Sequence, residues 1–80
     1  MNRQIFQRRN RLTNQEYEML EFRALNQRYE DVLNEDFGTL EEYNTTSEKQ
    51  YSSLEELAED LRDELAGDEQ EMFEVLAKMV

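Results

Sequence analysis

Residues 53–80 read SLEELAEDLRDELAGDEQEMFEVLAKMV, and this stretch decides the fold. Its apolar residues recur every three or four positions, the spacing that places them on one face of an α-helix. Either Ser52 or Ser53 can cap the first helix, because each has a glutamate three residues on. Asp68 repeats that pattern directly after Gly67, so we expect a helix-turn-helix hairpin that pivots at these two residues. The apolar positions are Leu54, Leu57, Ala58, Leu61 and Leu65 before the turn, then Met72, Phe73, Val75, Leu76, Met79 and Val80.

Residues 13–37 are expected to form one long helix. Thr13 and Glu16 have the spacing of a capping box, and Gly38 is well placed to end the helix in a left-handed cap. The apolar stripe is wider than a coiled-coil seam, so we expect this helix to touch two neighbours. Phe22, Leu25, Tyr29, Val32 and Leu33 share one face, while Tyr17, Leu20 and Ala24 lie to its side.

The two remaining segments carry weaker patterns. Residues 38–52 hold isolated apolar residues among polar ones, and we expect a linker with one helical turn. Residues 1–12 form a basic segment, which becomes a short helix if Ile5, Phe6 and Leu12 share a side. Proline is absent and glycine occurs twice, so few β-hairpin turns are available. We therefore predict one all-α domain, a small helical bundle of a long helix plus a C-terminal helix-turn-helix hairpin, with a short N-terminal helix.

Charge is divided unevenly between the halves of the chain. The net charge is −11, and residues 41–80 hold thirteen acids against three bases, whereas residues 1–40 hold seven against six. There is no cysteine and no apolar run of membrane-spanning length, and the N-terminal residues are charged where a signal peptide is apolar. We therefore expect a cytoplasmic protein without a membrane span.

The residue types bear on catalysis and metal binding. Histidine, the commonest general base, is absent, and 80 residues leave little room to enclose a substrate. We therefore predict no enzymatic activity. Acids lie close together along the helix expected from residue 54 to 66, but their spacing lacks the alternating ligands of a calcium loop. We expect neither a metal site nor a cofactor.

The helix expected over residues 54–66 has the densest negative charge. It carries six acids along about 20 Å, or one per about 3.3 Å, and a DNA strand carries one charge per about 3.4 Å. A solvated amphipathic helix also has such a face, but a charge of −11 exceeds the magnitude of roughly 2–8 that keeps a small domain soluble. We therefore predict a partner-binding acidic face formed by Glu55, Glu56, Glu59, Asp60, Asp63 and Glu64.

A second charged group lies in the first twelve residues. Its four arginines either contact an anion or act as internal counterions to the acidic half. Four bases neutralise few phosphates and the acidic half repels nucleic acid, so we expect no direct nucleic-acid binding. The residues are Arg3, Arg8, Arg9 and Arg11.

Composition and pattern support three functional hypotheses. The first is a non-enzymatic, acidic protein-binding module that docks on a basic protein surface, in its sharpest form an inhibitor that mimics nucleic-acid charge in a binding groove. Small phage-encoded inhibitors of restriction or CRISPR nucleases are similar in size and charge. The second is a structural or assembly protein, homo-oligomeric in its simplest form, whose apolar stripes make a homodimer or a joint with a larger subunit. The third is an antitoxin or adaptor that folds on its partner.

Overall fold

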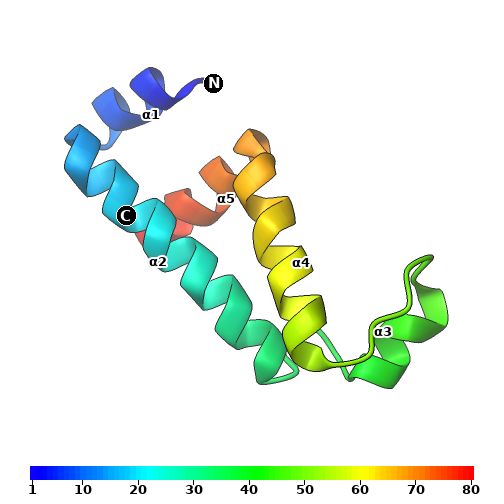
Figure 1. Ribbon diagram of the computed structural model, residues 1–80. Helices are drawn as coiled ribbons and strands as arrows, with labels where there is room; N and C mark the ends of the chain where they lie inside the picture. The colour runs from blue at the N-terminus through cyan, green and yellow to red at the C-terminus, as the bar shows by residue number, and fades with distance from the viewer.

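The computed structural model describes residues 1–80 as five α-helices without a strand (Figure 1). The all-α class expected from the sequence is therefore confirmed. The long helix is α2, the two helices of the C-terminal stretch are α4 and α5, and a short N-terminal helix is also present. Their bounds are α1 (Arg3–Arg9), α2 (Asn14–Leu33), α3 (Leu40–Thr46), α4 (Leu54–Gly67) and α5 (Glu69–Met79).

The helix starts follow the capping patterns in the sequence. The Thr13 hydroxyl accepts a hydrogen bond from the Glu16 N–H at 3.1 Å, and Glu16 Oε1 accepts one from the Thr13 N–H at 3.0 Å. Ser53, rather than Ser52, caps α4 by accepting a hydrogen bond at 3.1 Å from the N–H three residues on. Asp68 is the single residue between α4 and α5, and its carboxylate caps α5. The two C-terminal helices therefore meet where the sequence places their turn.

The end of α2 differs from expectation. The left-handed cap expected at Gly38 is wrong, because α2 ends at Leu33 and Glu35 adopts the left-handed conformation with φ of 61°. The N–H groups of Glu35 and Asp36 donate to carbonyls of the last helical turn at 3.0 and 2.9 Å, which forms a Schellman motif. Gly38, with φ of 101°, shapes the next turn instead. Arg11 ends α1 in the same way with φ of 55°, so charged residues occupy two positions that usually hold glycine.

Glu35→Gly is expected to raise the free energy of unfolding by about 1 kcal/mol. A side chain in the left-handed region costs roughly 1–2 kcal/mol, and the larger entropy of unfolded glycine offsets part of the gain. Urea denaturation followed by circular dichroism measures the change. Asn34→Gly is the matched control. Asn34 has φ of −85°, so it has no left-handed strain for glycine to relieve. A Glu35→Gly variant no more stable than the wild type would contradict the prediction.

The segment expected to be a linker with one helical turn contains a longer helix. α3 spans seven residues, and the Thr39 hydroxyl caps it by accepting a hydrogen bond from the Glu42 N–H at 3.2 Å. Within α3, the Asn44 side chain donates to the Tyr51 carbonyl and accepts from the Tyr51 N–H, both at 2.9 Å. These polar contacts hold the returning chain beside α3. Apolar spacing does not reveal such contacts, so the helix is longer than the single turn expected from the sequence.

α2 and α4 form a V in which the two helices run in opposite directions (Figure 1). They meet where α2 ends and α4 begins, and they diverge toward the other end, where α1 and α5 lie (Figure 1). An ion pair between Arg28 Nη2 of α2 and Glu71 Oε1 of α5, at 2.8 Å, joins α5 to the long helix. α2 therefore contacts both α4 and α5, as its wide apolar stripe predicted.

The apolar core is divided between the two ends of the V. The first cluster lies at the open end and unites α1, α2, α4 and α5, where the rings of Phe6 and Phe73 stack with centroids 5.3 Å apart. The second cluster lies at the closed end and joins α2, α4 and the chain that returns from α3. Buried residues of the first cluster are Phe6, Tyr17, Ala24, Leu65, Met72, Phe73 and Leu76, and those of the second are Val32, Tyr51, Leu57, Ala58 and Leu61.

Phe22 does not lie in the core, although its helical spacing placed it with Tyr29 and Val32. Its exposed fraction is 66%, whereas Tyr17 and Ala24 on another side of α2 are buried. Tyr17 and Ala24 pack with residues of α1, α4 and α5 in the first cluster, whereas Phe22 belongs to neither cluster. The buried side of α2 therefore rotates along its length, which a single helical stripe does not predict.

The molecule is elongated and its core is thin. Its extents are 42 × 20 × 16 Å, and its radius of gyration is 14.3 Å, against about 12 Å for a compact chain of this length. The accessible surface is 5736 Å², against about 5,100 Å² for a compact monomer of 9.7 kDa. Only 12 of the 80 residues are buried, so the margin of stability rests on few side chains.

Candidate protein-binding surface

α4 has one apolar side and one acidic side. Its apolar residues Leu57, Ala58, Leu61 and Leu65 are buried in the two core clusters. The acids fall between them in the sequence, so the period of 3.6 residues turns the acids away from the core. Four of the six candidate acids are exposed, and we name these four the acidic strip: Glu55, Glu59, Asp63 and Glu64.

The other two candidate acids are bound within the molecule. Glu56 Oε2 accepts hydrogen bonds from the Ser52 hydroxyl at 2.6 Å and from the Ser52 N–H at 3.0 Å. Asp60 Oδ2 accepts a hydrogen bond from Lys49 Nζ at 2.9 Å. These hydrogen bonds favour the charged carboxylates and lower the pKa of both Glu56 and Asp60. Both acids hold the segment before α4, so they are less available to a partner than the acidic strip.

Tyr51 lies beneath the contact between Lys49 and Asp60. Its ring is buried, and Lys49 Nζ is 5.2 Å from the ring centroid. Burial, and secondly the interaction of the hydroxyl with the Asp60 carboxylate, raises the pKa of Tyr51 to about 12. The fold therefore favours the neutral phenol over the phenolate.

The ionisation of Tyr51 is expected to remove about 2 kcal/mol of stability between pH 9 and pH 12. The pKa is about 12 in the folded protein, whereas an unfolded tyrosine has a pKa of about 10. The stabilisation of the folded state by the neutral Tyr51 side chain is therefore complete below pH 10 and is lost as the pH rises toward 12. Urea denaturation at stepped pH measures it, with Tyr51→Phe as the reference that lacks this ionisation. Identical pH dependences of the two proteins would show that Tyr51 does not titrate as described.

Few bases oppose the acidic strip. Four ion pairs engage four of the nine bases, and sixteen of the twenty acids lie outside any ion pair. The strip takes part in one of them, between Arg62 and Asp63 at 3.6 Å, and such an exposed pair is weak. The strip is therefore largely uncompensated charge on a packed helix. The ion pairs are Arg3–Glu18, Arg28–Glu71, Lys49–Asp60 and Arg62–Asp63.

The N-terminal arginines divide into two groups. The Arg3 guanidinium pairs with Glu18 at 3.3 Å and lies 4.5 Å from the centroid of the Tyr17 ring. Arg8, Arg9 and Arg11 are exposed and form no ion pair. The role of internal counterion therefore applies to Arg3 alone, and its partner belongs to α2 rather than to the acidic C-terminal half.

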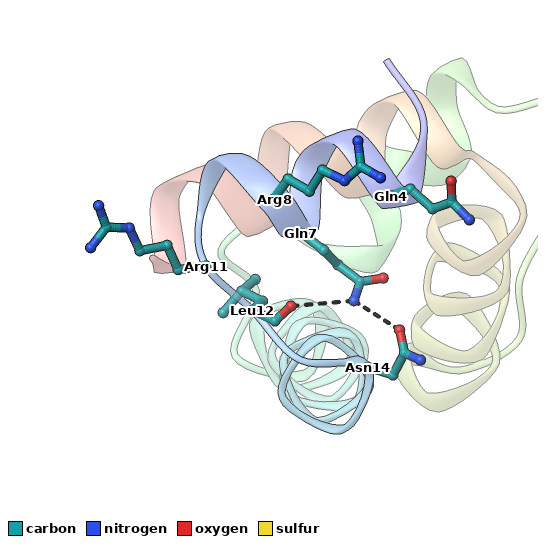
Figure 2. A pocket seen from close by; sticks show the side chains of 6 residues that line it. All are labelled: Gln4, Gln7, Arg8, Arg11, Leu12 and Asn14. Atoms are coloured by element: carbon teal, nitrogen blue, oxygen red, sulfur yellow. Dashed lines mark hydrogen bonds between the residues drawn. The ribbon is translucent and has the colours of Figure 1, made fainter.

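An open pocket of about 400 Å³ lies between α1 and the start of α2 (Figure 2). Gln7 Nε2 donates hydrogen bonds to the Leu12 carbonyl at 3.3 Å and to Asn14 Oδ1 at 2.9 Å, which joins the two helices. Figure 2 shows that the side chains of Arg8 and Arg11 point in different directions. Because the two guanidinium groups do not converge, the pocket does not have the geometry of a site for one anion.

An exposed apolar pair on α2 was missed by the sequence analysis. Met19 and Phe22 have exposed fractions of 60% and 66%, although helical spacing assigned Phe22 to the core. The apolar stripes that were expected to pair in a homodimer are instead largely buried in the protein's own core, through Leu57, Leu65 and Leu76. No sequence signal separates the exposed apolar residues from the buried ones, because both groups have helical spacing.

The structure has neither a metal-binding cluster nor a membrane-spanning helix. No group of three or more acidic side chains is arranged to hold a metal ion. None of the helices combines the length and apolar character that crossing a bilayer requires. No family model, curated protein or solved structure matches the chain. The function is therefore inferred from the surface of the molecule itself.

Proposed function

We propose that this protein is a non-enzymatic binding module whose acidic strip docks on a basic surface of another protein. The observation that carries the proposal is the position of the strip, with four exposed acids on the outer side of a helix whose inner side is buried. The nearest base, Arg62, is adjacent in sequence and forms only a long ion pair with the strip. A basic partner would supply the missing counter-charge.

The fixed backbone of α4 supports this role. Ser53 caps its start, and its inner residues pack in both core clusters, so the strip does not need to order its backbone on binding. Preorganised groups lose less entropy when they bind. Complementary charge also raises the rate of encounter, and salt reduces that effect because it screens exposed charges beyond about 10 Å at 0.1 M.

More specifically, we propose that the protein is an inhibitor that occupies the nucleic-acid-binding groove of its partner. The strip extends from Glu55 to Glu64 and places four acids along about 15 Å, or one per about 4 Å. A DNA strand carries one charge per about 3.4 Å. The charge per unit length of the strip therefore remains similar to that of a DNA strand even when Glu56 and Asp60, which bind within the molecule, are left out. A phosphate-binding groove is thus a basic surface whose charge spacing suits the strip.

Capture from a cell lysate tests the proposal. The protein is immobilised through its C-terminus, where Val80 lies against α2 rather than α4, and bound proteins are eluted with stepped salt or, separately, with duplex DNA. We expect nucleic-acid-binding proteins in both eluates, with release by salt between about 0.1 and 0.5 M. If DNA releases nothing, or if the captured proteins are indifferent to salt, the acidic strip serves only to keep the protein in solution.

A further inference from the structure

The exposed apolar residues of α2 form part of a continuous surface. Met19 and Phe22 lie about one turn apart, and their exposed fractions of 60% and 66% are the largest of any large apolar residues in the chain. Scattered apolar residues are normal on protein surfaces, but contiguous ones mark sites of association. We name the surface around them the α2 patch. It is lined by Leu12, Glu16, Met19, Leu20, Phe22, Arg23, Met79 and Val80.

The α2 patch combines a projecting side chain with two hollows. One hollow, of about 360 Å³, is lined mainly by Leu12, Met19, Leu20 and Val80. A second, of about 260 Å³, is mainly polar and combines Phe22 and Met79 with Arg23, Asn26, Gln27 and Glu30. Arg23 lines both hollows and therefore lies between them. Each copy of the surface provides an exposed phenyl ring, from Phe22, and an apolar hollow on the other side of Arg23, so two copies can each contribute both features to one contact.

The charges at the ends of the α2 patch are self-complementary. Glu16 and Arg23 are seven residues apart, so they lie on the same side of α2 about 10 Å apart, with Met19 and Leu20 between them. If two α2 helices pack antiparallel about a two-fold axis between Met19 and Leu20, Glu16 of each copy lies opposite Arg23 of the other. Arg23 forms no ion pair within the chain. Glu16 Oε1 accepts the capping hydrogen bond from Thr13, which leaves Oε2 available.

We infer that the α2 patch binds a second copy of this chain and forms an isologous dimer. The elongated monomer has an accessible surface of 5736 Å², which is about 600 Å² more than a compact chain of its mass exposes, and the dimer covers part of that excess. The acidic strip projects from α4 on the side opposite to its packed face, so it lies outside this contact. The inference is independent of the proposed function, because it uses different residues.

Sedimentation equilibrium over protein concentrations from about 5 μM to 1 mM tests the dimer. We expect a reversible monomer–dimer equilibrium that strengthens when salt rises from about 0.02 to 0.15 M, because salt screens the repulsion between two chains of charge −11. Docking of the acidic strip on a basic partner weakens over the same range, so the two proposals are tested separately. A protein that stays monomeric throughout overturns the inference.

Substitutions locate the interface. Met19→Gln combined with Phe22→Gln is expected to raise the dimer Kd about tenfold or more, since each change enters the interface twice. Ile5→Gln is the matched control, because Ile5 is 44% exposed on α1 and lies outside the α2 patch. It is expected to leave the Kd unchanged. A dimer that is insensitive to the paired substitution, or equally sensitive to Ile5→Gln, forms elsewhere.

A charge exchange tests the two-fold geometry. Arg23→Glu places like charges opposite each other and is expected to raise the Kd about tenfold. Adding Glu16→Arg restores opposite charges and is expected to return the Kd to within about threefold of the wild type. Thermal denaturation of each variant reports the separate effect of losing the Glu16 cap. If the double variant dimerises no better than Arg23→Glu, then Glu16 and Arg23 do not face each other.

Discussion

Reversal of three strip residues, through Glu55→Lys, Glu59→Lys and Asp63→Lys together, is expected to weaken binding of a basic partner at least a hundredfold. The three residues lie one turn apart along the exposed side of α4, so the change replaces a row of negative charges with a row of positive ones. Like charges placed against each other across an interface cost several kcal/mol, and a hundredfold loss corresponds to about 2.7 kcal/mol. Titration of a partner captured from the lysate, at fixed salt, measures the loss.

The matched control changes the same net charge at other positions. Glu41→Lys, Glu48→Lys and Glu74→Lys together also replace three exposed acids, none of which forms an ion pair or a side-chain hydrogen bond. We expect this variant to keep its affinity within about threefold, because distant exposed charges are screened at physiological salt. If both variants lose binding equally, overall charge rather than the acidic strip determines recognition. Circular dichroism verifies that both variants remain helical.

Leu65→Ala is expected to lower the free energy of unfolding by about 3–4 kcal/mol. The side chain is fully buried in the first cluster, where residues of four helices meet, and truncation leaves a cavity there. A domain of this length has a total stability of roughly 4–12 kcal/mol, and a thin core favours the lower part of that range. We therefore expect a large fall in Tm, measured by circular dichroism, and a substantial unfolded fraction at 37 °C.

Two further variants separate burial from a general effect on α4. Leu54→Ala makes the same change at a half-buried position in the first turn of α4, and we expect a loss of about 1 kcal/mol. Leu65→Met nearly conserves side-chain volume, and we expect it to lose less than about 1.5 kcal/mol. A Leu65→Ala variant no less stable than Leu54→Ala would show that the first cluster does not hold the helices together.

The helix starts were predictable because a cap is a local pattern. Thr13, Ser53 and Asp68 each satisfy backbone N–H groups within three residues, so the signal is complete in the sequence. The helix ends were less predictable. The Schellman motifs at Arg11 and Glu35 depend on backbone hydrogen bonds that any residue can make once the helix stops. Without glycine at these positions, the sequence contains no marker for them.

The arrangement of the helices depends on contacts between distant residues. Helical spacing groups Phe22 with core residues, but α1, α4 and α5 pack around Tyr17 and Ala24 on another side of α2 and leave Phe22 in solvent. The acidic face was predicted as six residues, and the structure leaves four of them exposed. Glu56 and Asp60 bind Ser52 and Lys49, and the Lys49 contact depends on how the segment after α3 returns to α4. Residue spacing along α4 contains no information about that path.

Asp68 connects α4 to α5 without any additional residue. The direction of the last helix is consequently set by the two backbone dihedral angles of this one residue, φ of −112° and ψ of 94°. α5 has 11 residues and a length of about 16 Å, so a rotation of about 10° at its start swings its far end by about 3 Å. A small change in the backbone of Asp68 is thus amplified at the other end of α5, where Met79 forms part of the α2 patch.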